Sequence, residues 1–169
     1  MRRAVYLAKE AGAYEVIVVV GALAEEVMAA VGNITNVASA LNPDWKTGLA
    51  SSLAAGLEAA KKLRLDAVLV MTTDQPLIDA TSLRKLVRAF NDEHRIIASS
   101  YDDIVGVPAV FGAEHFDDLM KLKGDEGAGR WLRSRPDDVT TISIDNASLD
   151  IDTPADVARL LSQKPGSTE

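Results

Sequence analysis

Aspartates at two places in the sequence have the chemistry of a divalent-cation site. Asp74 follows the apolar run 67–70, and Asp150 and Asp152 come just before Pro154. Mg²⁺ prefers carboxylate oxygens and typically takes one or two of them together with substrate phosphates. Zn²⁺ favours histidine and cysteine ligands, which these segments lack. Two strand ends of a compact domain could bring the aspartates together, although Asp152 is equally suited to cap a helix that begins at Pro154.

A glycine-rich segment, 122–132, has the composition of a phosphate-binding turn. Its glycines allow the backbone to approach a ligand closely, and the N–H groups at the start of the helix that follows favour phosphate. The glycines are Gly124, Gly127 and Gly129, and the cations beside them are Lys123, Arg130 and Arg133. Composition alone slightly favours a simpler interpretation, in which a turn is followed by a solvated, charged helix.

A third segment, 41–53, combines polar and aromatic residues at the entry to a predicted helix. Hydroxyl groups and an indole at this position could hold a base or a sugar. The residues concerned are Asn42, Trp45, Gly48, Ser51 and Ser52. Capping of the helix and packing of the indole would explain the same residues, so this segment alone is a weak indicator of function.

The composition argues against several other kinds of chemistry. The chain has 169 residues and no cysteine, which excludes disulfides and thiolate sites and fits a cytoplasmic protein. Its two histidines, His94 and His115, stand apart from any nucleophile pattern, and neither a serine-hydrolase elbow, a Walker loop nor a G-x-G-x-x-G fingerprint occurs. A net charge of −7 disfavours nucleic-acid binding. No apolar run approaches the roughly 20 residues of a membrane span.

Strands and helices are predicted to alternate along the chain. Continuous β-branched runs and helical spacing distinguish the two kinds of element. The predicted strands are 15–21, 34–39, 66–71, 95–101, 106–112 and 139–145, and the predicted helices are 1–12, 23–32, 48–63, 79–90, 113–122, 127–134 and 153–163. Thr47 is the expected N-cap of the helix at 48–63, and Asp79 or Thr81 that of the helix at 79–90.

This alternation predicts an α/β fold. We expect a doubly wound, mainly parallel sheet with helices on both faces, in three layers. Residues 1–163 are expected to form a single domain, followed by a flexible tail at 164–169. Ligands of such sheets bind outside the carboxyl ends of the strands, and Asp74 is predicted to lie at such an end.

Six segments resemble, in their order along the chain, the MobA/MocA-like nucleotidyltransferases and most closely their molybdenum cofactor cytidylyltransferase branch. The segments are EVIVVVGALAEEV, NPDWKTGLASSL, DAVLVMTTDQPL, GVPAVFG, LKGDEGAGRWL and LDIDTPADV. No single motif is decisive, but the set covers nearly the whole chain. The resemblance implies a Rossmann-like nucleotide-diphospho-sugar transferase fold. It also implies transfer of a nucleotide from CTP or GTP to a phosphate-bearing acceptor, with release of pyrophosphate.

The resemblance further implies roles for individual residues. Asp74 would be the catalytic residue that binds Mg²⁺, with Asp150 or Asp152 as the second ligand. The nucleotide would lie near Asn42, Gly48 and Ser52. The acceptor, a molybdopterin-type compound, would lie near Gln75, Pro108, Gly124, Asp125, Gly127 and Arg130. A sugar-phosphate or other phospho-acceptor, and a non-catalytic scaffold protein, are the alternatives, and the sequence leaves open whether the protein is a homo-oligomer.

Two features depart from the family pattern. The family usually has an arginine directly after G-A in the glycine-rich turn, where this chain has Gly129 followed by Arg130. The family also begins with a strand and a glycine-rich nucleotide loop, L-A-A-G-x-S-x-R-M-G-x-x-K, whereas Met1 falls at the helix that comes after them. That strand would lie between 15–21 and 66–71. We therefore expect that these two strands pair directly, that another chain fills the gap, or, preferably, that the natural protein is longer and that this chain binds NTP weakly.

Overall fold

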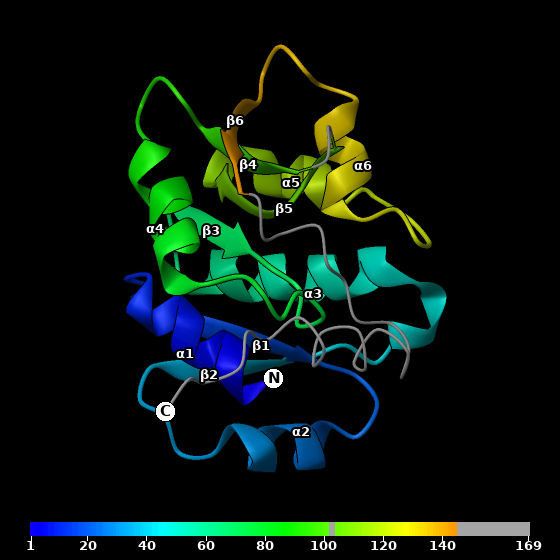
Figure 1. Ribbon diagram of the computed structural model, residues 1–169. Helices are drawn as coiled ribbons and strands as arrows, with labels where there is room; N and C mark the ends of the chain where they lie inside the picture. Colours follow the sequence, from blue (N-terminus) through cyan, green and yellow to red (C-terminus); the bar gives the residue numbers. More distant parts are fainter. Residues whose placement is uncertain (102–103, 145–169) are drawn as a thin grey trace, which may run out of the picture.

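Strands and helices alternate in the computed structural model, which describes residues 1–101 and 104–144 (Figure 1). The elements, in chain order, are α1 (Arg2–Glu10), β1 (Val16–Val20), α2 (Ala24–Val31), β2 (Val37–Leu41), η1 (Trp45–Thr47), α3 (Leu49–Lys62), β3 (Ala67–Val70), α4 (Ala80–Ala89), β4 (Ile96–Tyr101), β5 (Ile104–Gly112), η2 (Ala113–His115), α5 (Phe116–Leu119), α6 (Ala128–Arg133) and β6 (Thr140–Ser143). Each predicted element up to residue 144 is therefore confirmed in type. The helix and tail predicted beyond that point lie outside the described residues.

Local chemistry explains where two of the helices begin. The side chain of Asp79 accepts a hydrogen bond of 2.7 Å from the backbone N–H of Ser82, so Asp79 is the predicted N-cap of α4. The cap predicted for α3 was wrong, because Gly48 occupies that position with a φ of 116°. Thr47 belongs instead to the 3-10 turn η1, where its hydroxyl donates to the carbonyl of Asp44 at 2.8 Å.

The strands form a mainly parallel arrangement with one reversed member. β1 and β2 pair in parallel, and the other sheet has the order β3-β5-β4-β6. β4 pairs in parallel with β6, whereas β5 runs antiparallel to both β3 and β4. Only two residues separate β4 from β5 in the sequence, a connection short enough for an antiparallel hairpin but too short for a parallel crossover.

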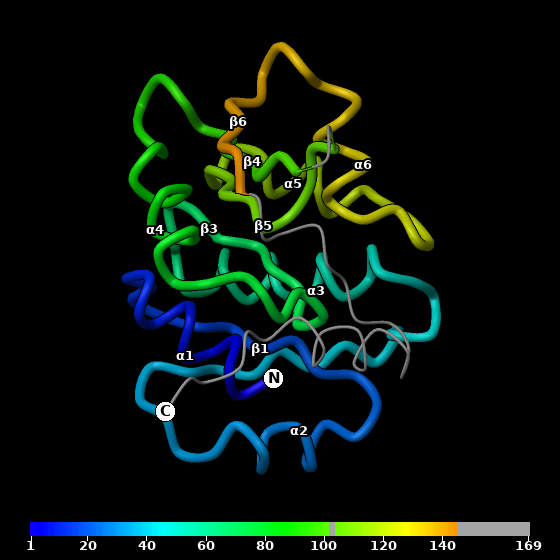
Figure 2. The backbone as a smooth tube through the Cα atoms, viewed as in Figure 1, coloured from blue at the N-terminus to red at the C-terminus, as the bar shows by residue number. Residues whose placement is uncertain are grey.

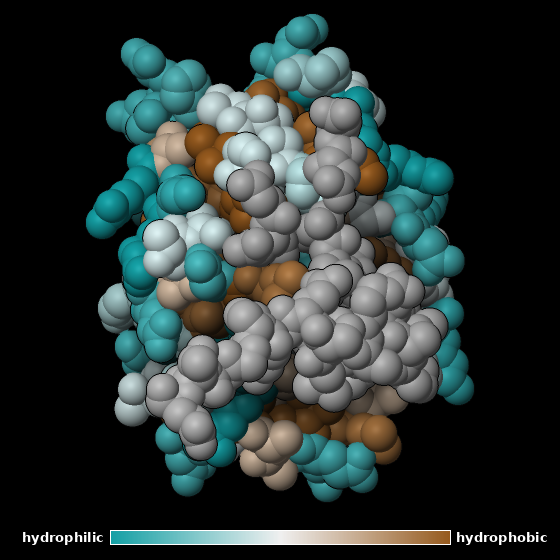
Figure 3. All heavy atoms as spheres, viewed as in Figure 1, coloured by the Kyte–Doolittle hydropathy of each residue, from teal (hydrophilic) through white to brown (hydrophobic). Residues whose placement is uncertain are grey.

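Helices cover both faces of the larger sheet, so the three-layer α/β prediction is confirmed. Alternate strand residues point to opposite faces. Ile96, Ala98 and Phe111 pack with residues of α3, α5 and α6, whereas Ile97 and Val110 pack with residues of α1 and α4. The backbone trace in Figure 2 follows these two helical layers on either side of the strands. In the face drawn in Figure 3, hydrophilic residues line the outer margin and hydrophobic residues show mainly toward the middle.

β1 and β3 belong to different sheets, so the expectation that these two strands pair directly was wrong. The β1–β2 pair lies below the four-stranded sheet in Figure 1. Helices connect the two sheets on both faces. On one face, Leu57 and Ala60 of α3 share a cluster with Ile17 of β1 and Val68 of β3. On the other face, α1 contributes Val5 to the cluster around β1 and Leu7 to the cluster around β3.

No helix of the described residues has the length and apolar character needed to cross a membrane.

Candidate functional site

Asp74 lies in the loop between the carboxyl end of β3 and the start of α4, as predicted. One carboxylate oxygen, Oδ1, is buried and has no hydrogen-bond partner among the residues that the structure describes. A buried carboxylate oxygen without a donor is unfavourable unless a cation or another ligand contacts it. The chemistry of this oxygen therefore fits a hard divalent cation at the strand end.

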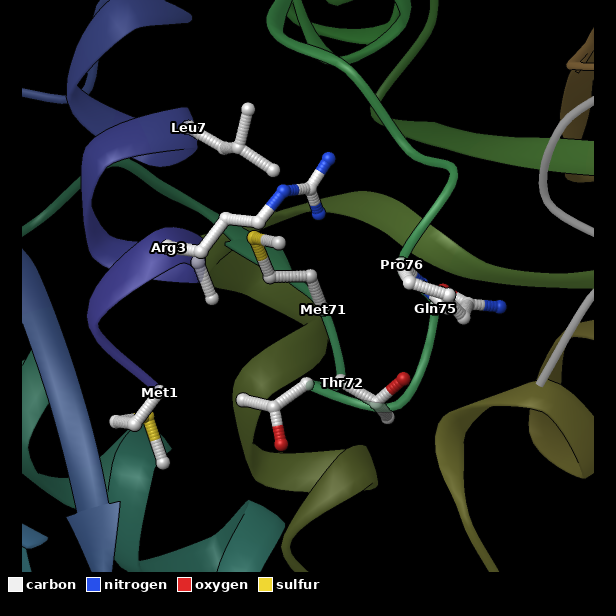
Figure 4. Close-up of a pocket in the computed structure, with 9 residues that line it drawn as sticks. Met1, Arg3, Leu7, Met71, Thr72, Gln75 and Pro76 are labelled. Carbon is white, nitrogen blue, oxygen red and sulfur yellow. The ribbon is translucent and has the colours of Figure 1, made fainter. Parts of the chain in front are cut away.

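Contacts from two other elements hold the loop that carries Asp74. The amide nitrogen Nε2 of Gln75 donates to the carbonyl of Val107 in β5 at 3.2 Å. The guanidinium of Arg3 in α1 donates to the carbonyl of Ile78 at 2.8 Å. Figure 4 shows Arg3 reaching from α1 toward this loop. With the cap at Asp79, these bonds hold the part of the loop that follows Asp74.

A small cavity lies between the start of α1 and the same loop (Figure 4). Its volume is about 90 Å³. Residues of α1 and of the strand end line it, among them Arg3, Leu7, Met71, Thr72 and Thr73. The cavity is too small for a whole nucleotide, and Asp74 is not among the residues that line it.

The predicted nucleotide residues Asn42 and Ser52 form one hydrogen-bonded group. Asn42 is 3% exposed, and its amide nitrogen donates to the hydroxyls of Ser51 at 2.9 Å and Ser52 at 3.0 Å. Its amide oxygen accepts from the backbone N–H of Asp44 at 3.0 Å. Asn42 thus fixes the loop after β2 against the first turn of α3.

Gly48 brings the second and third predicted segments together. A Cβ atom at this position would overlap the backbone of Gly124 and lie 2.8 Å from the backbone nitrogen of Asp125. The backbone N–H of Ala50 donates to the carbonyl of Gly124 at 3.0 Å. Gly127 also lies against Leu49, since a Cβ at Gly127 would lie 2.7 Å from a methyl group of Leu49. The segments predicted to bind the nucleotide and the acceptor are therefore in direct contact at Gly48 and Gly124, although about 75 residues separate them in the sequence.

The other predicted acceptor residues differ in their exposure. Arg130 is exposed and forms an ion pair of 3.2 Å with Glu126, and Asp125 is exposed in the turn. Gly124 has a φ of 58°, and Gly127 precedes α6. Pro108 is fully buried in β5, next to the carbonyl that Gln75 contacts. Their roles in acceptor binding stay predictions.

Asp150 and Asp152 lie outside the described residues. Within residues 1–101 and 104–144, no group of three or more histidine, cysteine or acidic side chains could hold a metal ion. Asp74 is therefore the predicted metal ligand whose position the structure gives, and the second ligand stays a prediction.

Sequence reasoning missed the residues that support the site from a distance. Arg3 acts on the Asp74 loop from 75 positions away, and the partner of Gln75 is a backbone carbonyl of β5. Neither contact has a local motif. Only the helical register of α1 and the strand order, which bring these groups next to the loop, could have indicated them.

The strongest resolved pKa shift lies in another part of the fold. Arg95 binds both carboxylate oxygens of Glu114, at 2.6 and 2.9 Å. The hydrogen bonds from Arg95 lower the pKa of Glu114 from 4.5 to about 2. His115 beside them packs edge-on against Trp131, with ring centroids 5.8 Å apart. This group flanks the start of β4 and the end of β5, whereas Asp74 follows the end of β3, so it is a structural ion pair.

Comparison with known proteins identifies the family of this chain. The family model described as MobA-like NTP transferase domain matches residues 1–139. Nicotine blue oxidoreductase from Paenarthrobacter nicotinovorans is 31% identical over 160 residues, which are 89% of this chain and 76% of that protein.

Three solved structures have the same fold. Rv0371c from Mycobacterium tuberculosis H37Rv is 28% identical with a TM-score of 0.76, over 94% of this chain and 82% of that one. A structure of Rv0371c in complex with manganese is also similar, with 25% identity and a TM-score of 0.71 over 94% and 84% of the two chains. A nucleotidyl transferase from Methanothermobacter, 24% identical, shares the fold with a TM-score of 0.75 over 92% and 76%.

Proposed function

The chain belongs to the MobA-like NTP transferase family, and from this premise we propose that it transfers a nucleoside monophosphate from CTP or GTP to a phosphorylated acceptor of the molybdopterin type. Family membership supports nucleotidyl transfer as the reaction class. The nucleotide, the acceptor and a cytoplasmic location are our proposals. Pyrophosphate leaves as the acceptor phosphate attacks the α-phosphorus.

The observation that carries the proposal is the buried Oδ1 of Asp74, which has no hydrogen-bond donor among the described residues. We propose that this oxygen binds Mg²⁺, with Asp150 or Asp152 as the second ligand. A bound divalent cation would neutralise the charge of the triphosphate. The manganese complex of Rv0371c supports a divalent cation in a protein of this fold.

The chain's own side chains supply positioning. Phosphoryl transfer of this kind depends mainly on alignment and charge neutralisation and needs no covalent intermediate. Gln75 and Arg3 hold the Asp74 loop, and Asn42 holds Ser52. The contact between Gly48 and Gly124 keeps the proposed nucleotide and acceptor segments at one distance.

The test compares Asp74→Asn with Asp138→Asn, an exposed aspartate near the start of β6. Both are made in a chain extended by a strand and loop of the family pattern, and pyrophosphate release is measured with CTP or GTP, Mg²⁺ or Mn²⁺ and a pterin acceptor. We expect Asp74→Asn to lower the rate by about 100-fold or more, and Asp138→Asn to leave it unchanged. Equal rates for the two variants would remove Asp74 from the mechanism.

The acceptor is tested separately. Pyrophosphate release with a sugar 1-phosphate, and none with a pterin, would assign the alternative acceptor to the same scaffold. No release with any acceptor, together with no nucleotide binding, would support the non-catalytic scaffold.

An oxidoreductase is a second candidate, because a relative 31% identical over 89% of the chain is named as one. The chain lacks the G-x-G-x-x-G fingerprint for dinucleotides, which makes this candidate the weaker of the two. Oxidation of NADH or NADPH in the presence of an aromatic dye would favour it, and a failure to oxidise either would exclude it.

A further inference from the structure

A larger cavity lies beside the starts of β4 and β6. Its volume is about 510 Å³, which is within the range of small-molecule pockets, whereas the cavity beside α1 has about 90 Å³. The loop before β4, the loop before β6 and the side chain of His115 line it. Its charged and titratable residues are Glu93, His94, Arg95, His115, Asp137 and Asp138.

This cavity and Asp74 lie at opposite ends of the strands. β3 and β4 both run antiparallel to β5, so they point the same way, and β6 is parallel to β4. Asp74 follows the carboxyl end of β3, whereas the two lining loops precede β4 and β6. The six residues of β4 span about 20 Å. In Figure 1 the two loops lie at the top of the molecule, away from α1 and α2, so a molecule in this cavity does not occupy the site proposed for nucleotidyl transfer.

The walls of the cavity carry three carboxylates that no cation of the described residues neutralises. Glu93, Asp137 and Asp138 are exposed, and none of them forms a salt bridge within the part of the chain that the structure describes. The guanidinium of Arg95 is directed to Glu114, whose two carboxylate oxygens accept from it at 2.6 and 2.9 Å. The cavity is therefore negative and favours a cationic ligand.

Both histidines of the chain, His94 and His115, line this cavity. The ring of His115 is held between Trp131, against which it packs edge-on, and the carboxylate of Glu114, which lies 3.8 Å from Nε2. A neutral imidazole has one acceptor nitrogen and a carboxylate has only acceptors, so the lining favours a ligand with N–H donors. Among the described residues, no group of three histidine or acidic side chains could hold a metal ion. An organic cation therefore matches the lining better than a metal ion does.

Apolar side chains form the part of the wall where the two strands begin. Ile97 of β4 is the partner of Thr140 of β6, so Ile96 and Val139, one residue earlier, are neighbours on adjacent strands. Ile96 is buried and Val139 is half-buried, and both line the cavity. A ligand in which methylene groups separate the cationic nitrogens would match this combination of apolar and acidic groups.

We propose that this cavity binds a linear organic polycation of the polyamine class. Its ammonium groups donate charge-assisted hydrogen bonds to Glu93 on one loop and to Asp137 and Asp138 on the other, and its methylene groups pack on Ile96 and Val139. Because the carboxylates reach solvent, their desolvation costs little, and the interaction weakens as the salt concentration rises. This inference does not depend on the nucleotidyl transfer proposed above.

The ring signals of the histidines test the location of the ligand, because the chain has two histidines and both line the cavity. The whole chain is titrated with spermidine by NMR at constant pH and about 0.15 M salt. We expect both ring signals to shift together and to saturate. Putrescine, with two ammonium groups, should bind more weakly, and butylamine, with one, more weakly still. Saturable heat in calorimetry without movement of either ring signal would place the amine elsewhere and overturn the proposal.

Mg²⁺ tests whether positive charge alone is sufficient. At the same ionic strength and pH, we expect Mg²⁺ to leave both histidine ring signals in place, because it has no methylene groups to pack on the apolar wall. Shifts with Mg²⁺ as large as those with spermidine would mean that any cation screens this acidic surface. That result would overturn the assignment to a polyamine, as would equal affinities for spermidine and butylamine.

A pair of double variants separates the cavity from the net charge of the chain. Glu93→Gln with Asp137→Asn removes two exposed carboxylates from the cavity, and Glu25→Gln with Glu26→Gln removes two exposed carboxylates from the start of α2. The net charge changes equally in both. We expect the cavity variant to bind spermidine about tenfold more weakly, as for two solvent-exposed charged hydrogen bonds, and the α2 variant to bind it like the unaltered chain. Equal weakening in the two variants would show a response to net charge alone and would overturn the proposed site.

Discussion

Replacement of Gly48 by alanine tests whether the close contact between the start of α3 and the turn at Gly124 stabilises the fold and the proposed nucleotide site. The matched control is Gly12→Ala. Both glycines have a φ that side chains rarely adopt, 116° at Gly48 and 105° at Gly12. They differ in their surroundings, because a Cβ at Gly12 would meet nothing within 4 Å, whereas one at Gly48 would overlap the backbone of Gly124.

The structure allows the two costs to be separated. The unfavourable φ costs about 1–2 kcal/mol at either position. At Gly48 the overlapping atoms are backbone atoms of Gly124 and Asp125, which cannot rotate away as a flexible side chain would. Moving them breaks the bond from Ala50 to Gly124, which adds about 1 kcal/mol. We therefore expect Gly48→Ala to lose at least about 1 kcal/mol more free energy of unfolding than Gly12→Ala.

Urea denaturation of both variants measures this difference, and nucleotide titration of the same samples measures the site. Gly48→Ala should bind CTP or GTP more weakly, because its strain displaces the turn at Gly124 and the start of α3 together. Gly12→Ala should bind like the unaltered chain. Equal losses of stability in the two variants would mean that the contact with Gly124 contributes nothing, and the reasoning would be refuted.

Two further predictions concern the carboxylates of Asp79 and Glu114. Asp79→Ala should lower the free energy of unfolding by about 1 kcal/mol, because it removes the cap of α4. Asp79→Asn keeps a capping oxygen, so its free energy of unfolding should lie within a few tenths of a kcal/mol of that of the unaltered chain. Equal losses for the two variants in a urea titration would contradict the capping role of Asp79. Glu114→Gln should lower the Tm at pH 7, because the folded-state pKa of Glu114, about 2, is below its ordinary value of 4.5. The stability from this pair is present above pH 4.5 and is lost as the pH falls toward 2, so a Tm difference that persists at pH 2 would contradict it.

The elements were predictable because their signals are local. Five consecutive β-branched or apolar residues, as in 16–20, can be recognised as a strand in isolation. Whether β1 and β3 pair directly was left open by the sequence, and the structure places them in different sheets. The Thr47 cap was wrong for a local reason as well. Its hydroxyl had a competing acceptor, the carbonyl of Asp44, which closes a 3-10 turn.

The candidate site was predictable in composition but not in its contacts. The sequence indicated that Asp74, Asn42 and Gly124 belong to ligand-binding segments. It could not indicate that Gly48 touches Gly124, because that contact depends on how α3 and the turn before α6 pack against the sheet. The same is true of the bond from Arg3 to Ile78, which depends on the register of α1.

One helix sets the distance between the two halves of the proposed site. The first turn of α3 carries Ser52, and its later residues Leu57 and Ala60 pack in the cluster that contains Val68 and Val70 of β3, the strand that leads to Asp74. β3 shares no sheet with β1 or β2, so strand hydrogen bonds do not set this distance. A helix of 14 residues is about 21 Å long and nearly incompressible. The nucleotide contact predicted at Ser52 and the metal contact proposed at Asp74 are therefore held in fixed relation by the packing of α3, and small residues such as Ala60 allow that packing.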